Sequence, residues 1–350
     1  MMLQLALIGF GNVGREFARL LLSRREWLRR SEYIDVEVLA IATKRHGSLL
    51  SDRALNLERV LYELEEKGTL RGYGPELTEL SPLEIIERCD ADIMVELTTL
   101  NIESGQPAID HIKAAFRAGM SVITTNKGPL SFAYEDLRGI ARSRGAQFRF
   151  EGTVMDGTPV FNLVEKTLPG CEITGICGIL NSTTNYVLDE MYRGKDMEQA
   201  LEDAVRFGIA EADPSMDIDG WDAAAKITTL ANVLMEAKSS PRRVNRVGIR
   251  DLIPEAVSNA AREGRKIKLI AYAERVKGAV KTMVRPELLG PENLFWSVDG
   301  TSCAVTLKTD LMGEITVVES NPNLPQTAYA VFSDMVLIAD SIKRGVASSS

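Results

Sequence analysis

The chain has 350 residues, 45% hydrophobic and 26% charged, so it is long enough for two domains with a substantial core. Its net charge of -8 argues against nucleic-acid binding, which requires a basic surface, but is compatible with a small charged ligand. No apolar run approaches the roughly 18 residues of a membrane span, so a membrane is not expected as a partner. A nucleic acid is not expected either, because of the negative net charge.

The first 150 residues alternate between apolar strand patterns and helical patterns. A helix is expected after residue 14, and its apolar side carries Phe17, Leu20, Leu21 and Trp27. The polar segment 48–80 is expected to be helical and to cover the sheet. The remaining predicted elements are strands at 3–8, 36–42, 91–98, 120–125 and 148–154 and a helix at 107–119. This order predicts a Rossmann-type, doubly wound α/β nucleotide-binding domain over residues 1–150.

Beyond Glu151 strands and helices no longer alternate simply, which predicts a mixed α+β domain for catalysis and dimerisation over 151–325. The predicted elements are strands at 173–180, 281–289, 297–309 and 313–319 and helices at 183–193, 196–207 and 221–237. A last amphipathic helix at 326–345 is expected to pack back onto the first domain, and residues 347–350 are expected to fray.

The start of the chain and its cysteines predict a cytoplasmic protein. The apolar opening MMLQLALIG lacks the basic region of a signal peptide and is interpreted as a buried strand. The cysteines, which contain no C-x-x-C pair, fit a reducing compartment and give no zinc site. A catalytic triad or metal cluster built on histidine is also disfavoured, because the chain has only two histidines. These residues are Cys89, Cys171, Cys177, Cys303, His46 and His111.

The turn at 9–14 has the G-x-G-x-x-G spacing of a dinucleotide-binding site. Gly9 allows the tight turn, Gly11 lets a pyrophosphate approach the backbone, and Gly14 permits close packing of helix on strand. Because the turn follows a predicted strand and opens a predicted helix, we predict a nucleotide site; a tight turn without a ligand is the alternative. The residues assigned to it are Gly9, Phe10, Gly11, Asn12, Val13 and Gly14.

The end of the second strand indicates which dinucleotide is preferred. Sites that prefer NAD usually carry Asp or Glu there to hold the ribose 2′-hydroxyl, but this chain has Thr43, Lys44 and Arg45. Cationic side chains suit a 2′-phosphate, which a guanidinium binds through two hydrogen bonds. Lys44 and Arg45 therefore favour NADP(H), with NAD(H) as the second choice and a solvated basic loop as the alternative.

Hydride transfer to a carbonyl requires a group that polarises the oxygen and a path for the proton. In open α/β sheets this chemistry lies at the carboxyl ends of the strands, and Lys127 falls just past the strand at 120–125. Thr98, which ends the strand at 91–98, is assigned to the cofactor together with Lys127. For Lys127 a surface lysine on a loop is the alternative.

Lys226 is the second candidate. Asp222 and Lys226 form an i, i+4 pair on one helix face, for which a surface salt bridge worth ~0.3–0.5 kcal/mol is the plain interpretation. The helix after Asp222 is mostly apolar, so Lys226 is expected on a largely buried element. A buried lysine among carboxylates stays charged and can act as an acid, while its partner fixes its position.

Further carboxylates lie just upstream in the segment 208–226. Glu211 and Asp217 suit a substrate ammonium. Calcium is the competing ligand, but the segment lacks the distal glutamate of a calcium loop. Asp213 and Asp219 are interpreted as capping or turn residues.

The chain resembles the homoserine dehydrogenase family along nearly its whole length, on five motifs in the same order. They are GFGNVG (9–14), TTNKGPL (124–130), EGTVMDGTPV (151–160), GILNSTTNYVLDEM (178–191) and GIAEADPSMDIDGWDAAAK (208–226). The resemblance implies reversible NAD(P)H-dependent reduction of L-aspartate 4-semialdehyde to L-homoserine, a step toward threonine, methionine and isoleucine. It also implies a homodimer. Because the helix at 326–345 ends the sequence, we expect a short monofunctional enzyme without an ACT regulatory domain.

The resemblance also implies roles for single residues. Lys127 and Lys226 would lie at the reacting oxygen, with Lys226 as general acid and base and Asp222 holding the hydroxyl or Lys226 itself. The residues implied for the amino-acid end are Glu211 and Asp217, with Thr183 and its neighbour Ser182 on the carboxylate side. A monovalent cation, usually sodium, would be bound by the side chain of Glu151 and the carbonyls of Val154, Asp156 and Thr158. Such a carbonyl loop with one acid suits a hard cation, and a capped turn is the alternative.

Two departures from the family pattern stand out. The family's N-G-T-T-N run has serine at position 182, which adds a side chain where backbone approaches the ligand. The loop 318–325 contains no glycine where the family has a glycine-rich loop, and a stiffer loop is expected to alter cofactor affinity or closing. The competing functions are an NADP-dependent reductase of another amino-acid-derived carbonyl, and a non-catalytic NADP-binding regulatory protein, which would not need the two lysines.

Overall fold

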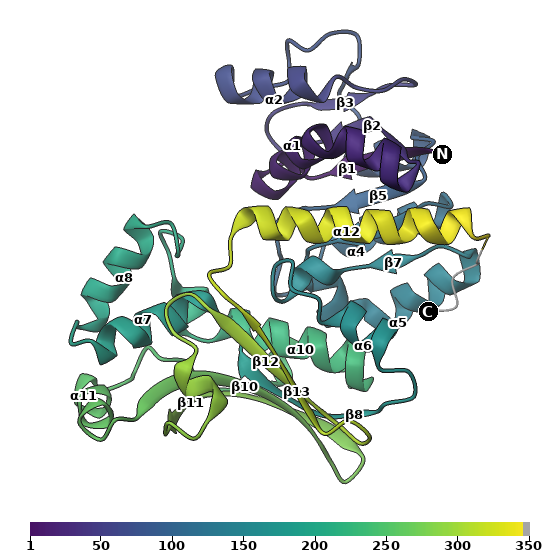
Figure 1. Ribbon diagram of the computed structural model, residues 1–350. Coiled ribbons are helices and arrows are strands. Elements are labelled where there is room, and N and C mark those ends of the chain that lie inside the picture. Colours follow the sequence, from purple (N-terminus) through teal and green to yellow (C-terminus); the bar gives the residue numbers. More distant parts are fainter. Residues whose placement is uncertain (346–350) are drawn as a thin grey trace. The chain divides into compact units, whose positions relative to one another are not determined.

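The computed structural model describes residues 1–345, so the predicted fraying of residues 347–350 lies outside the described residues (Figure 1). The chain forms two compact units. Unit 1 comprises Met1–Gly157 and the segment from Asn323 onward, and unit 2 comprises Thr158–Pro322. The expected domain boundaries are at residues 150 and 325. Among the described helices, none combines the length and apolarity needed to cross a membrane.

Unit 1 is built on a seven-stranded sheet in the order β4-β3-β2-β1-β5-β6-β7. Neighbours from β2 to β7 pair in parallel, whereas β3 and β4 pair antiparallel at one edge. The strands are β1 (Met2–Ile8), β2 (Asp35–Ala42), β3 (Ser48–Leu50), β4 (Leu77–Thr78), β5 (Ile93–Glu96), β6 (Ser121–Thr124) and β7 (Phe148–Arg149). The predicted α/β, Rossmann-type fold class is confirmed.

Helices cover both faces of this sheet. They are α1 (Asn12–Trp27), α2 (Leu57–Glu66), α3 (Pro82–Arg88), α4 (Ala108–Arg117), α5 (Lys127–Arg144) and α12 (Leu324–Lys343). Successive residues of β1 point to opposite faces, so that Leu5 and Leu7 pack with α1 and α12 while Ala6 and Ile8 pack with α3 and α4.

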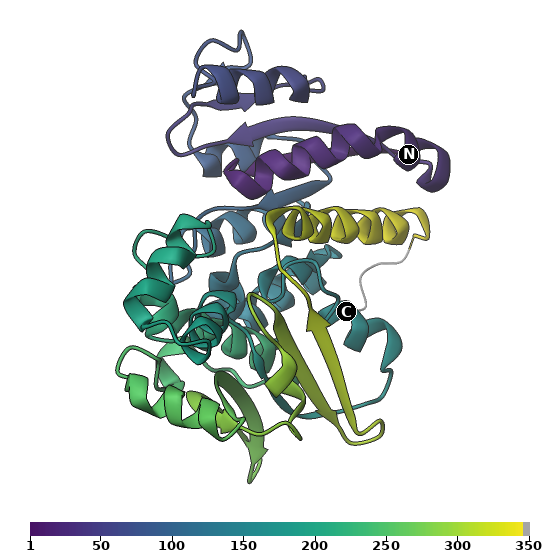
Figure 2. The same ribbon diagram turned by 60° about the vertical axis from the view of Figure 1, so that its left-hand side comes forward.

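The last helix, α12, belongs to unit 1 although it comes from the far end of the sequence (Figure 2). It begins at a capping box in which Asn323 and Gln326 satisfy each other's backbone N–H groups. It packs along α1, where the Phe332 and Trp27 ring centroids lie 6.0 Å apart. Trp27, expected on the packed side of α1, is nevertheless 43% exposed.

Two expectations for unit 1 are wrong in part. The segment 48–80 is not helical throughout, because β3 and β4 extend the sheet at its edge and only α2 is an α-helix there. The apolar Leu49 is fully buried in the core, which favours a strand at this point. The strand expected at 148–154 stops at Arg149, and a 3-10 turn, η2 (Glu151–Thr153), follows it.

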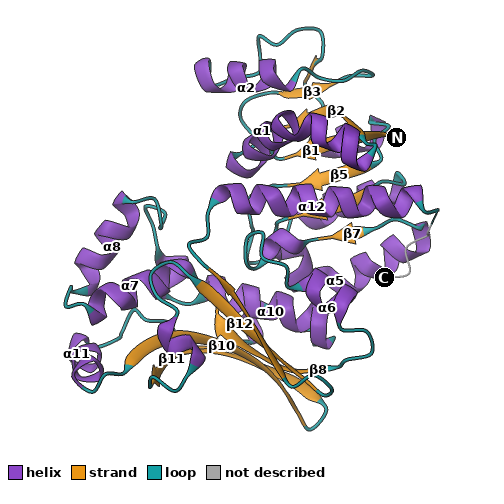
Figure 3. Cartoon of the chain, in the orientation of Figure 1, coloured by secondary structure: helices purple, strands orange, loops and turns teal. Residues whose placement is uncertain are grey.

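Unit 2 has a six-stranded sheet in the order β13-β12-β8-β10-β11-β9, mostly antiparallel (Figure 3). Its strands are β8 (Ile173–Ile179), β9 (Asn245–Arg246), β10 (Lys266–Val276), β11 (Ala279–Leu289), β12 (Cys303–Thr309) and β13 (Glu314–Glu319). Its helices are α6 (Phe161–Thr167), α7 (Ser182–Tyr192), α8 (Met197–Arg206), α9 (Ser215–Ile218), α10 (Trp221–Met235) and α11 (Pro254–Arg262). The mixed α+β architecture predicted for this part is confirmed.

The central strand β10 is absent from the predicted elements because charged residues obscure its apolar pattern. Lys268 is 1% exposed, and its Nζ donates to Asn185 Oδ1 at 2.9 Å and to the Val298 carbonyl at 2.7 Å. Burial lowers the pKa of Lys268, and Asp299 acts in the opposite direction. A lysine that looks exposed in the sequence is therefore a satisfied core residue.

Candidate active site

The glycine-rich turn lies at the carboxyl end of β1, where β1 has parallel neighbours on both sides. This is the switch point at which open α/β sheets bind ligands. Gly9 has φ +95°, and a Cβ there would lie 2.5 Å from the Leu97 carbonyl carbon, so only glycine fits. A Cβ on Gly14 would lie 3.1 Å from the Gly9 carbonyl oxygen, which explains the close packing of α1 on the turn.

Gly11 differs from the other two glycines. It precedes α1, and a Cβ built on it meets no atom within 4 Å. The start of α1 is thus open above Gly11, as a pyrophosphate bound to backbone N–H groups requires. Phe10 is buried in the core, so only its backbone can face a ligand. Asn12 and Val13 are the first residues of α1.

The basic loop after β2 forms a compact turn. The Thr43 hydroxyl donates to the Gly47 carbonyl at 2.7 Å and accepts from the His46 N–H at 2.9 Å. Lys44 and Arg45 project from this turn as exposed side chains, and neither makes an ion pair with another residue of the described chain. Both cations are therefore available to an anionic ligand.

The ends of β5 and β6 are tied together by Asn126. Its side-chain amide donates to the Thr98 carbonyl at 3.1 Å, and its Oδ1 accepts from the Gly128 N–H at 3.0 Å, which caps α5. Lys127 is the first residue of α5 and follows this cap directly. Thr98 and Lys127, both predicted for the cofactor, thus lie at the same carboxyl edge of the sheet as the glycine turn.

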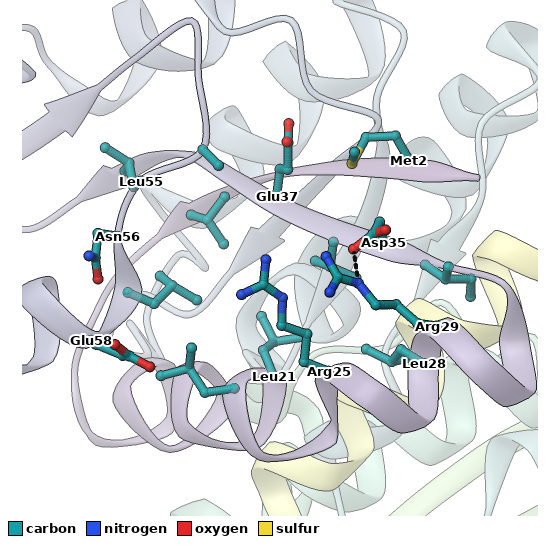
Figure 4. A pocket seen from close by; sticks show the side chains of 16 residues that line it. Met2, Leu21, Arg25, Leu28, Arg29, Asp35, Glu37, Leu55, Asn56 and Glu58 are labelled. Carbon is teal, nitrogen blue, oxygen red and sulfur yellow. Dashed lines mark hydrogen bonds and ion pairs between the residues drawn. The ribbon is translucent and has the colours of Figure 1, made fainter.

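A cavity of about 370 Å³ lies at the opposite ends of the same strands (Figure 4). Its lining includes Met2 and Asp35, near the starts of β1 and β2, and Arg25 and Arg29 of α1 and its extension. Arg29 Nε donates to Asp35 Oδ1 at 2.6 Å. Its place at the amino ends of the strands excludes it as the predicted dinucleotide site.

In unit 2 the polar cluster centres on Asn181, the N-cap of α7. Its Oδ1 accepts from the Thr184 N–H at 2.8 Å. Its Nδ2 donates to Asp217 Oδ1 at 2.7 Å and to Asp222 Oδ2 at 3.0 Å. One amide group therefore holds two carboxylates from different helices, α9 and α10. Asn181 has no predicted role, although an asparagine just before a helix is a typical cap.

Lys226 joins the cluster from α10. Its Nζ donates to the Leu180 carbonyl at 2.7 Å and lies 3.3 Å from Asp222 Oδ2. The side chains of Lys226 and Asp222 are only 16% and 17% exposed, so this is not the surface salt bridge of the plain interpretation. The two contacts fix the direction of the ammonium group.

Asp217 carries the electrostatic signature of the cluster. Burial raises its pKa, and the neighbouring Asp222 carboxylate raises it further. Hydrogen bonds from Asn181 and Thr183 and the charge of Lys226 act in the opposite direction. A cationic ligand at Asp217 would favour its charged form.

The other carboxylates of the segment lie outside this cluster. Glu211 is exposed, and its assignment to the substrate stays a prediction. Asp213 accepts from the Ser215 N–H at 3.0 Å, as a turn residue does. Asp219 is bound through both oxygens by Arg250, at 2.5 and 3.0 Å. Neither of the last two contacts the Asn181 cluster.

Comparison with known proteins decides the family. A model for the homoserine dehydrogenase NAD-binding domain matches residues 9–151, and a model for homoserine dehydrogenase matches residues 159–336. The chain belongs to the homoserine dehydrogenase family. The resemblance carried by its five motifs is thereby confirmed.

Individual homoserine dehydrogenases match over nearly the full chain. The enzyme of Methanocaldococcus jannaschii is 37% identical, with 98% of this chain and 100% of the relative covered. An NAD(+)-dependent homoserine dehydrogenase of Pseudomonas canavaninivorans is 33% identical, with 97% of each covered. A hyperthermophilic archaeal homoserine dehydrogenase in complex with NADPH superposes with a TM-score of 0.82 at 30% identity, covering 97% of this chain and 98% of that one.

The structure accommodates both departures from the homoserine dehydrogenase pattern. Ser182 is the first residue of α7, a position that tolerates a side chain. In the loop 318–325, Asn321 adopts φ +52°, the left-handed conformation that glycine usually supplies. Asparagine is among the residues that tolerate this region, so the loop turns without glycine.

The residues assigned to a cation lie in a tight segment. Glu151 is buried in η2, and Asp156 adopts φ +40°, while its carboxylate accepts from the Thr327 hydroxyl at 3.0 Å. The Thr158 hydroxyl donates to Glu319 Oε1 at 3.1 Å. Within residues 1–345, no group of three or more His, Cys, Asp or Glu side chains could hold a metal. Any cation here would therefore depend on backbone carbonyls.

Proposed function

We propose that this chain catalyses the reversible reduction of L-aspartate 4-semialdehyde to L-homoserine, with NADP(H) as the preferred cofactor. The observation that carries the proposal is the Lys226 ammonium, held by Asp222 and the Leu180 carbonyl within a largely buried cluster. A binding protein has no need of such a group. Membership in the homoserine dehydrogenase family supports the same reaction.

The bound cofactor would supply a hydride to the carbonyl carbon of the semialdehyde. The Lys226 ammonium donates a proton to the carbonyl oxygen, which becomes the hydroxyl of homoserine. In the reverse direction the neutral amine of Lys226 removes that proton. Asp222 keeps the ammonium in place through its contact at 3.3 Å. Lys127, at the start of α5, polarises the carbonyl oxygen.

The amino-acid end of the substrate is assigned to the rest of the unit 2 cluster. Asp217, whose pKa burial raises, would pair with the substrate ammonium, and Glu211, which lies outside the cluster, is proposed as a second carboxylate. Ser182 and Thr183 open α7, and the backbone N–H groups at a helix start favour a carboxylate.

The preference for NADP(H) is supported by Lys44 and Arg45, which stand at the end of β2 where an acid would hold the NAD ribose. Among the relatives, one is NAD(+)-dependent by name and another is in complex with NADPH. The ratio of kcat/KM for NADPH over NADH tests the preference directly, and a ratio below one contradicts it.

Three further properties belong to the proposal. Glu151 and the carbonyls of Val154, Asp156 and Thr158 bind a monovalent cation, so replacing sodium by a large organic cation should lower activity. The protein is a homodimer, which light scattering tests. The apolar Val318 on the edge strand β13 is 52% exposed, which favours an interface there. It acts in the cytoplasm, in keeping with its free cysteines.

The deciding experiment follows NADPH oxidation by the purified protein with aspartate semialdehyde and a panel of other amino-acid-derived aldehydes. We expect turnover with the semialdehyde and the reverse reaction with homoserine and NADP⁺. Absence of turnover in both directions would refute the proposal. Faster turnover of another aldehyde would instead favour a related reductase.

A further inference from the structure

Glu96 is a fully buried carboxylate at the carboxyl edge of the unit 1 sheet. It ends β5, where it pairs in register with Ile8 of β1 on one side and with Thr124 of β6 on the other. Its exposed fraction is 0%, and no lysine or arginine forms an ion pair with it anywhere in the described chain. The position is thus the centre of the switch point, one residue pair away from Gly9.

The carboxylate is held by hydroxyl and amide donors. Glu96 Oε1 accepts from the Thr98 N–H at 3.0 Å and also from the Thr98 hydroxyl. Glu96 Oε2 accepts from the Thr124 hydroxyl at 3.0 Å. The His111 Nδ1 atom is buried without a hydrogen-bond partner in residues 1–345 and lies 3.9 Å from Oε1, too far for a bond.

These contacts close into a ring that reaches Lys127. The Thr124 hydroxyl accepts from the Asn126 N–H at 3.0 Å, and the Asn126 side chain donates to the Thr98 carbonyl at 3.1 Å. Asn126 in turn caps α5, whose first residue is Lys127. Glu96, Thr98, Asn126 and Thr124 therefore form one ring, in which Glu96 is the single charged member.

The ring also abuts the glycine turn. A Cβ on Gly9 would lie 2.8 Å from the Thr98 nitrogen, the same N–H that donates to Glu96. If Thr98 shifted toward Gly9, its backbone would consequently collide with the backbone of the turn. The three strand ends that face the predicted cofactor are thus coupled through one carboxylate.

We propose that Glu96 is a positioning residue of the cofactor site, which fixes Thr98 directly and Lys127 through Thr124 and Asn126. The inference rests on the proposed function, since Thr98 is predicted to contact the cofactor and Lys127 both the cofactor and the carbonyl oxygen. A buried carboxylate without a Lys or Arg partner costs free energy that an apolar side chain would not. Stability alone therefore does not explain a glutamate at position 96, whereas the need to position Thr98 and Lys127 does.

The test uses Glu96→Leu and Glu96→Gln, with NADPH affinity measured by fluorescence titration without substrate. Leu removes every acceptor, and we expect the Kd for NADPH to rise about tenfold or more, the effect of losing one or two charged hydrogen bonds. Gln can accept from Thr98 through its carbonyl and donate to Thr124 through its amide. It should therefore keep the Kd within about threefold of wild type.

Glu63→Leu is the matched control, because Glu63 of α2 is also a buried glutamate of unit 1 and pairs with Lys67, just after that helix, at 2.9 Å. We expect it to lower the melting temperature while leaving the NADPH Kd and kcat unchanged. An unchanged Kd in Glu96→Leu, an equal loss in Glu63→Leu, or a failure of Gln to rescue would each overturn the proposal.

Thr124→Val covers the case in which Glu96→Leu does not fold. It keeps the carboxylate and its bonds to Thr98 but cuts the link to Asn126, so the Kd should rise roughly threefold to tenfold. No change in Kd would overturn the proposal. The affinity for NADPH is measured without substrate, so the two proposals are tested separately. A wild-type protein that binds NADPH but does not reduce the semialdehyde refutes the proposed function. The NADPH affinities of the Glu96 variants still decide the positioning role.

Discussion

Replacing Lys226 by methionine removes the ammonium while keeping an unbranched side chain of similar length. General acid–base catalysis by a positioned side chain contributes about 10²–10⁴-fold, so we expect kcat to fall by that factor. This corresponds to roughly 3–5 kcal/mol of activation free energy. The Kd for NADPH should stay the same, because Lys226 lies in unit 2 and the predicted cofactor residues lie in unit 1.

The same change has a smaller effect on stability. The Leu180 carbonyl and Asp222 both lose a charged donor. Breaking a fully buried pair costs about 3–5 kcal/mol, but these side chains remain 16% and 17% exposed, and Asn181 still donates to Asp222 at 3.0 Å. We therefore expect the free energy of unfolding to fall by only ~1–3 kcal/mol.

The assay measures homoserine oxidation in parallel with thermal unfolding. Lys195→Met is the matched control, since Lys195 pairs with Glu190 and Asp203 at 2.5 and 2.7 Å elsewhere in unit 2. It should change stability but not kcat. If Lys226→Met keeps kcat within about threefold of wild type, Lys226 is structural and the proposed proton transfer is wrong.

Three other tests address separate parts of the site. Asp217→Asn should raise stability at neutral pH yet weaken homoserine binding. Burial raises the pKa of Asp217, so the contribution of this residue to the free energy of unfolding falls as the pH rises from the usual aspartate range through the raised pKa. Unfolding curves at several pH values would show whether asparagine abolishes this pH dependence. Lys44→Ala combined with Arg45→Ala should lower kcat/KM for NADPH about tenfold or more with little change for NADH, and equal losses for both would contradict a 2′-phosphate site. Gly11→Ala should fold normally and lose NADPH affinity. Gly9→Ala, at a position with φ +95° and a clash at 2.5 Å, should destabilise the protein itself by roughly 1–3 kcal/mol or more. Similar melting temperatures for the two variants would refute this distinction.

The parts of the site that follow from local rules could be predicted from the sequence. The spacing of Gly9, Gly11 and Gly14 between a strand and a helix fixes their surroundings through backbone geometry alone. The pairing of Asp222 with Lys226 follows from the helical repeat, and the apolar residues around it indicate burial. Each of these depends on contacts within a few residues.

Features that depend on distant contacts could not be predicted in this way. Asn181 is recognisable as a cap, but its bonds to Asp217 and Asp222 span 36 and 41 residues. In the sequence, Lys268 has the character of a surface residue. In the structure it is buried, and its ammonium donates to Asn185 and Val298, which are distant in the sequence. The importance of Glu96 likewise appears only when β5 and β6 lie side by side.

The position of α12 in unit 1 has a consequence for synthesis on the ribosome. Residues of α12 such as Val331, Met335 and Ile338 are fully buried in the core that α1 and the sheet begin. The apolar face of the emerging N-terminal part must therefore stay uncovered until α12 (Leu324–Lys343) has left the exit tunnel. Most domains fold in order as they are translated, but here unit 2 can complete its fold before unit 1 does. The nucleotide-binding unit is then completed only after all of unit 2 has been synthesised and α12 has emerged.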